Sequence, residues 1–122
     1  MSQHSINVPA LSSLDDIEKK ANQFQKEGDS HNAMVWMGHC YLKRKDYPKA
    51  IQCFEKTQSW EALSDIYLTL GQEKKYHHYF AKYLLSENLV KEAAQSFHEA
   101  GSFLQAAKLY ENLFDFKRAI AA

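Results

Sequence analysis

The stretch SFHEAGSFLQAAKLYENLFDFKRAIAA (Ser96–Ala122) contains one apolar pattern twice. The first copy places residues at i, i+3, i+4 and i+7, namely Phe103, Ala106, Ala107 and Tyr110. The second copy begins thirteen residues later with Phe116, Ala119 and Ile120. This spacing puts the apolar side chains on one face of a helix. A pattern that recurs at a fixed period indicates a repeated structural unit.

The same pattern extends back through most of the chain. Seven copies begin at residues 34, 47, 60, 76, 90, 103 and 116, and Ile17, Ala21 and Phe24 supply a weaker first copy. An interval of this length suits a helix of about ten residues, roughly 15 Å long, followed by a turn. The pattern therefore predicts eight helices, at 12–27, 30–44, 47–57, 60–70, 73–86, 89–100, 103–113 and 116–122.

Residues that cap helices support these boundaries. Side chains that can accept from the free N–H groups of a helix start precede five copies: Ser30, Asp46, Ser59, Ser102 and Asp115. Glycines that can adopt the left-handed conformation follow three helices: Gly28, Gly71 and Gly101. With Asp115 as a cap, we expect a turn between 113 and 116.

Helices this short are unstable alone in water and must bury their apolar faces against neighbours. Short turns make consecutive helices pack antiparallel. The sequence thus predicts an all-α fold, a right-handed α–α superhelix of about four antiparallel helix pairs spanning residues 12–122. Residues 1–11 lack a helical period and are expected to form a flexible arm. The repeats are expected to be a piece of a longer solenoid.

Two segments resemble the tetratricopeptide repeat. Met37-Gly38-x-x-Tyr41, followed by Ala50 and Phe54, is similar to the family's W-x2-LG-x2-Y, A and F positions. A second segment, Trp60-x2-Leu63-Ser64-x2-Tyr67 with Phe80, is also similar, although its glycine is replaced by serine and Tyr76 stands where alanine is expected. The units also advance by 26 to 30 residues, not the family's ~34. The later stretch, Glu92–Ala119, resembles the helical-pair solenoids of intraflagellar transport and coat scaffold proteins.

The resemblance implies a protein–protein interaction scaffold in which the first helix of each pair lines a concave groove. The matching positions are Asn32, Val35, His39, Leu42, Lys43, Glu61, Asp65 and Leu68. Some repeats of this family clamp the C-terminal carboxylate of a peptide, such as a chaperone's tail. Val35 and His39 do not fit the pattern of those repeats, so a site of this kind is disfavoured. The alternative interpretation is that these residues form solvated helix faces.

Composition narrows the possible functions. Fifteen basic residues balance fifteen acidic ones, so nothing favours nucleic acid as a partner. No stretch has the about 18 to 20 apolar residues of a membrane span. Two cysteines among apolar residues, Cys40 and Cys53, indicate reduced thiols in an intracellular, cytoplasmic protein.

No cofactor, metal or enzymatic activity is expected. Adjacent His77 and His78 point about 100° apart on a helix and cannot share one metal as an i, i+4 pair does. The glycine-rich phosphate loop, the G-x-S-x-G elbow and the H-E-x-x-H pair are missing from the sequence.

Three hypotheses follow. In the first, the groove binds a peptide or a helix of another protein. In the second, the chain is a structural segment of a larger solenoid in a trafficking or transport complex, and it self-associates through Phe116 and Ile120 to form a homo-oligomer. In the third, it is an accessory helical module of a larger enzyme.

Overall fold

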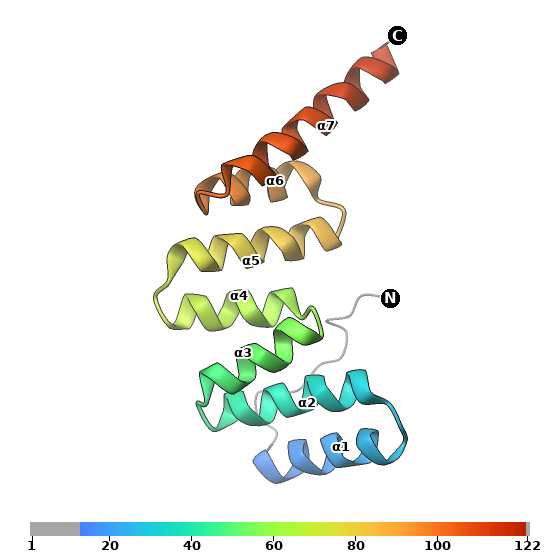
Figure 1. Ribbon diagram of the computed structural model, residues 1–122, viewed down its shortest axis with the longest axis vertical. Coiled ribbons are helices and arrows are strands. Elements are labelled where there is room, and N and C mark those ends of the chain that lie inside the picture. Colours follow the sequence, from blue (N-terminus) through green and yellow to red (C-terminus); the bar gives the residue numbers. More distant parts are fainter. Residues whose placement is uncertain (1–12, 122) are drawn as a thin grey trace. The chain divides into compact units, whose positions relative to one another are not determined.

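The computed structural model describes the backbone of residues 13–121 and the side chains of residues 13–114. All secondary structure in this range is α-helix (Figure 1). The helices are α1 (Leu14–Lys26), α2 (Ser30–Lys43), α3 (Tyr47–Lys56), α4 (Trp60–Thr69), α5 (Glu73–Ser86), α6 (Val90–Glu99) and α7 (Phe103–Ala121). The all-α prediction is confirmed. The predicted arm, residues 1–11, lies outside the described residues.

The helix starts show why these residues form these elements. Ser13 accepts from the Asp16 N–H at 3.2 Å, and Asp46 accepts from the Lys49 N–H at 3.4 Å. The predicted cap of α2 was wrong by one residue, because Asp29 accepts from the Asn32 N–H at 3.1 Å and Ser30 is already helical. An aspartate carboxylate is a full anion beside the free N–H groups, which favours it over a neighbouring serine at the same helix start.

The helix ends confirm the predicted role of glycine and add a second kind of turn. Gly28, Gly71 and Gly101 all have φ between +73° and +79°. At the other three turns the left-handed position is held by Lys45, Gln58 and Asn88, with φ between +55° and +63°. A side chain there is strained, because its Cβ crowds the following carbonyl oxygen.

The expected turn before Phe116 is absent, and this prediction was wrong. Helix α7 runs without interruption from Phe103 to Ala121, so the predicted helices 103–113 and 116–122 are one. Every other turn contains a residue with positive φ, whereas this stretch has neither glycine nor proline. An aspartate can cap a helix start but does not by itself end the preceding helix. The described residues therefore form seven helices, not eight in four pairs.

The chain divides into two compact units, Met1–Ala62 and Leu63–Ala122, with the division inside α4. In the first unit α2 packs against both α1 and α3. Fully buried side chains on each helix form its core: Ile17, Ala21, Ala33, Cys40, Ala50 and Phe54. The small side chains among them let the helices approach closely, as the predicted pattern requires.

In the second unit α6 packs against both α5 and α7. Ala81, Phe97 and Ala106 form a buried cluster against which Leu109 packs. One residue from each of three helices thus meets around a single phenylalanine ring. Helix α4 is joined to α5 by aromatic stacking, since the rings of Tyr67 and Tyr79 are 5.3 Å apart and 9° from parallel.

Candidate functional site

Helices α2 and α3 form a hairpin whose crossing is fixed by one glycine. A Cβ atom on Gly38 would stand 2.6 Å from Cε1 of Phe54. The Phe54 ring is fully buried and occupies the space that this missing side chain leaves. Asp46 caps α3, and Pro48 lies in its first turn, where the missing N–H costs little. The turn and the crossing together define the geometry of the hairpin.

The structure places the predicted groove residues of α2 in different environments. Val35 is buried, with 8% of its surface exposed. His39 is half-buried and meets Phe54 edge-on, with ring centroids 5.0 Å apart. Burial lowers the pKa of the His39 imidazole, because desolvation disfavours its charged form. Both side chains take part in packing within the first unit.

Asn32 is also held within the unit. Its Nδ2 donates to Asp29 Oδ2 at 2.7 Å. Its Oδ1 and the Nε1 of Trp36 are buried, and neither has a hydrogen-bond partner in the described part of the chain. Leu42 is half-buried and Lys43 is exposed.

The remaining groove residues lie on α4. Glu61 is half-buried in its first turn, in the first unit. In the second unit Asp65 is exposed, and 54% of the Leu68 surface is exposed. Lys43, Asp65 and Leu68 are thus the groove residues most open to solvent. Partner binding by the groove residues stays a prediction.

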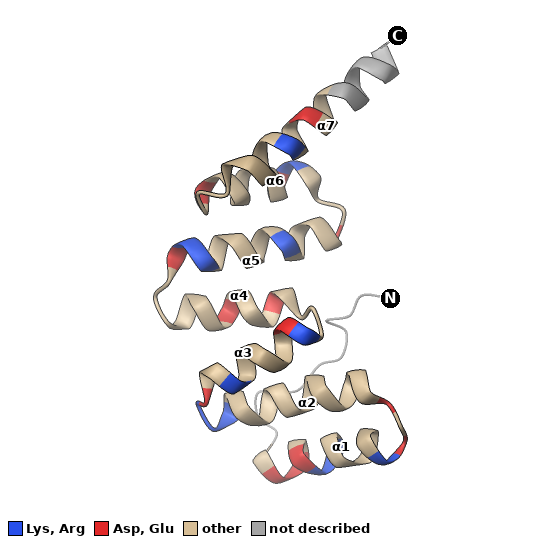
Figure 2. Ribbon diagram, in the orientation of Figure 1, with Lys and Arg blue, Asp and Glu red and all other residues tan. Residues whose placement is uncertain are grey.

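Residues of both charges are spread along the described helices. Figure 2 shows Lys and Arg interspersed with Asp and Glu along the described helices. An ion pair between Arg44 and Glu18 joins the end of α2 to α1. The described helices therefore carry no long run of basic residues of the kind that nucleic acid attracts.

The two adjacent histidines of α5 contact different residues. His77 Nδ1 lies 3.4 Å from Glu99 Oε2, and His78 Nδ1 lies 3.0 Å from Ser102 Oγ. Burial, and secondarily the Lys82 ammonium, lower the pKa of His78. Across residues whose side chains are described, no three His, Cys, Asp or Glu come together in a way that could hold a metal. The histidines join α5 to the corner between α6 and α7.

A pocket between α2 and α3 was missed by the sequence analysis. Its volume is about 210 Å³, and it is lined by Met34, Tyr41, Lys49, Gln52, Cys53 and Lys56. The residues from α3 stand at i, i+3, i+4 and i+7, and the two from α2 at i and i+7. That spacing was visible in the sequence, but pairing the two faces required the hairpin geometry.

Helix α7 exposes large apolar side chains. The exposed fraction is 81% for Leu104 and 60% for Phe114, and Phe103 is also exposed. The predicted self-association residues, Phe116 and Ile120, lie outside the residues whose side chains are described. An exposed apolar strip on a helix is typical of a surface that contacts another molecule.

Helices α2 and α3 form an antiparallel hairpin with a glycine where they cross. This arrangement places them in the class of helical repeat units. Residues 31–56 match the family model of the tetratricopeptide repeat. No curated protein and no solved structure matches the chain. The α2–α3 segment is therefore similar to a tetratricopeptide repeat, and the α-helices of the chain form a tetratricopeptide-like helical repeat fold. The resemblance of its later part to transport and coat solenoids stays a prediction.

Tetratricopeptide repeats generally mediate protein–protein interactions and are typically non-catalytic. Among residues 13–121, no helix combines the length and the apolar character that crossing a bilayer requires.

Proposed function

We propose that this chain is a non-catalytic scaffold that binds a peptide or a helix of another protein. The observation that carries the proposal is the tetratricopeptide repeat at residues 31–56. Exposed residues at groove positions support it, namely Lys43 on α2 and Asp65 and Leu68 on α4. These side chains are open to a partner without a rearrangement of the core. We place the interaction in the cytoplasm, a proposal supported by two cysteines that are free.

The test compares exposed residues inside and outside the predicted groove. Lys43→Glu and Leu68→Asp are the test variants, and Lys19→Glu and Leu85→Asp are matched controls, since both control residues are also exposed. Proteins captured from lysate by the unchanged chain are identified by mass spectrometry and then quantified for each variant. We expect each test variant to lose a captured partner that both controls keep.

Circular dichroism checks that all four variants keep their helix content. Equal capture by the test and control variants, with helix content intact, overturns the groove as the binding surface. Equal loss from all four variants overturns it too, because the partner then responds to charge anywhere on the chain.

A second candidate function is self-association as a structural segment of a larger assembly in trafficking or transport. The exposure of Leu104 and Phe114 on α7 favours it, because two such strips bury apolar surface when they meet. Light scattering during gel filtration measures the molar mass over a range of concentrations. We expect Leu104→Glu and Phe116→Glu to suppress a concentration-dependent rise in mass and Gln105→Glu to leave it unchanged. A chain that stays monomeric at every concentration contradicts this function.

A further inference from the structure

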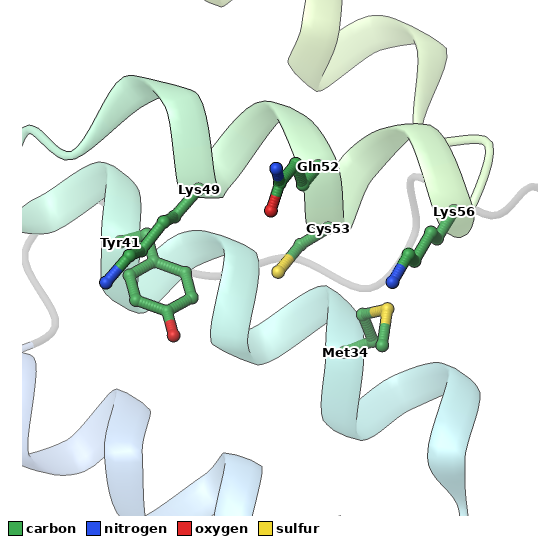
Figure 3. A pocket seen from close by; sticks show the side chains of 6 residues that line it. All are labelled: Met34, Tyr41, Lys49, Gln52, Cys53 and Lys56. Carbon is green, nitrogen blue, oxygen red and sulfur yellow. The ribbon is translucent and has the colours of Figure 1, made fainter.

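The pocket between α2 and α3 has two distinct ends, with Gln52 and Cys53 between them (Figure 3). Tyr41 and Lys49 lie at one end, and Met34 and Lys56 lie at the other. The Cys53 sulfur points from α3 into the space between these ends. All lining residues belong to the first unit, so the pocket depends only on how α2 packs against α3.

The walls of the pocket suit an apolar side chain. The Tyr41 ring, the Met34 thioether and the Cys53 thiol are weakly polar surfaces, and the Gln52 amide adds one polar group that a peptide backbone can pair with. Burial raises the pKa of the Cys53 thiol, which keeps it neutral at physiological pH. A volume of about 210 Å³ leaves room for one inserted side chain. It is too small for a whole helix, whose diameter with side chains is about 10–12 Å.

The rim of the pocket is positively charged. Two of its six lining residues are lysines, and none is acidic. Lys49 Nζ lies 5.5 Å from the centre of the Tyr41 ring and 3.9 Å from Asp46 Oδ2, an exposed and therefore weak pair. Within the described residues Lys56 makes no ion pair. The net charge at the rim therefore favours a negatively charged occupant.

The spacing of the lysines defines the form of that occupant. Lys49 and Lys56 are seven residues apart on α3, which separates them by about 10.5 Å along the helix. In an extended peptide, residues i, i+2 and i+4 point to one side, and i and i+4 are about 13 Å apart. The spacing of the peptide residues thus exceeds the spacing of the two lysines by about 1.3 Å at each end. A lysine side chain is long enough to cover this difference.

We propose that this pocket docks an extended acidic peptide from a partner protein. One apolar side chain inserts between Tyr41, Cys53 and Met34. Carboxylates two residues before and two residues after it contact Lys49 and Lys56. None of the pocket residues belongs to the predicted groove, so the site goes beyond the proposed function and either can fail alone.

The probe is a synthetic peptide, Gly-Glu-Ser-Leu-Ser-Glu-Gly, with both termini blocked and a neutral fluorophore attached. Fluorescence anisotropy measures its binding to the full chain. We expect saturable binding that weakens at least tenfold when the peptide leucine becomes serine. Binding should also weaken as salt rises from about 0.05 to about 0.3 M, since screening shortens the reach of the two lysines.

Variants of the chain locate the site. Lys56→Glu should weaken peptide binding at least tenfold and Lys56→Gln less, while Lys91→Glu, an exposed lysine on α6, should leave it unchanged. Methyl NMR should show the Met34 signal shifting with peptide concentration. Lys43→Glu and Leu68→Asp, which test the groove, should bind the peptide normally, and this separates the two proposals.

Four results overturn the proposal: no binding at about 1 mM peptide, equal binding of the serine peptide, equal loss from Lys56→Glu and Lys91→Glu, or a Met34 signal that does not move. Tighter binding of a helical peptide with glutamates at i and i+7 overturns the extended occupant.

Discussion

The Phe54 ring lies where a side chain on Gly38 would stand, with three ring atoms within 3.0 Å of the missing Cβ. Gly38→Ala gains about 1 kcal/mol of helix propensity but forces overlap with a fully buried ring, at a cost of about 1–3 kcal/mol. Since the overlap involves three atoms, we expect a net loss of about 1–2 kcal/mol in the free energy of unfolding. Urea titration followed by circular dichroism measures it.

The double variant Gly38→Ala, Phe54→Leu is the control for this overlap. Leucine lacks the ring atoms nearest to Gly38, so the alanine should cost less in that background. An alanine that stabilises the unchanged chain would show that the ring can move aside.

Lys45→Gly should stabilise the chain. Lys45 is exposed and has a φ of 61°, a conformation that costs about 1–2 kcal/mol with a side chain and nothing with glycine. Glycine also adds about 0.5–1 kcal/mol of entropy to the unfolded chain. We therefore expect a net gain of about 0.5–1 kcal/mol and a higher thermal midpoint. Lys45→Ala keeps the strain and should not raise the thermal midpoint. Equal thermal midpoints for the two variants would contradict this explanation.

The chain should lose stability as the pH falls below neutral. Burial lowers the folded-state pKa of His39 and His78 below the ordinary value of 6.5. The unfolded chain then binds more protons, so this stability is present above pH 6.5 and is lost as pH falls through the folded pKa. Urea midpoints measured between about pH 7.5 and pH 5 test this. His39→Gln should flatten the dependence, whereas His31→Gln, at an exposed position, should not.

Cys53 should react with a thiol reagent well before Cys40. Only 1% of Cys40 is exposed, whereas Cys53 is half-buried and lines the pocket. Burial raises the pKa of both thiols, so neither is activated as a thiolate and the expected difference rests on access. Alkylation with iodoacetamide, quantified by peptide mass spectrometry, should give at least a tenfold difference in rate. Similar rates would mean that the first unit opens before either thiol reacts.

The helix positions were predictable because period and capping agree along most of the chain. Asp46 and the three glycines mark their turns in the sequence, and the structure confirms them. The turn at Asn88 carries no such mark, and only the apolar spacing located it. The prediction of a turn at Asp115 was wrong, because the sequence has a possible cap residue there but no residue that ends the preceding helix.

The site was less predictable, because exposure depends on packing between helices. Family positions indicated Val35 and Lys43 equally, yet one is buried and the other is exposed. The pocket needed Tyr41 and Lys49 to face each other across a turn, a relationship that no single helical pattern contains. Sequence period predicts which face of a helix is apolar, but not which faces meet.

Helix α7 is almost twice as long as the helix it packs against. Its 19 residues span about 28 Å, while the ten residues of α6 span about 15 Å. Roughly 13 Å of α7 therefore extends past the end of α6 (Figure 1). On the part of α7 whose side chains are described, Leu104 and Phe114 are exposed to solvent. We therefore expect the isolated chain to precipitate at high concentration. A solubilising fusion placed after α7 should reduce this precipitation.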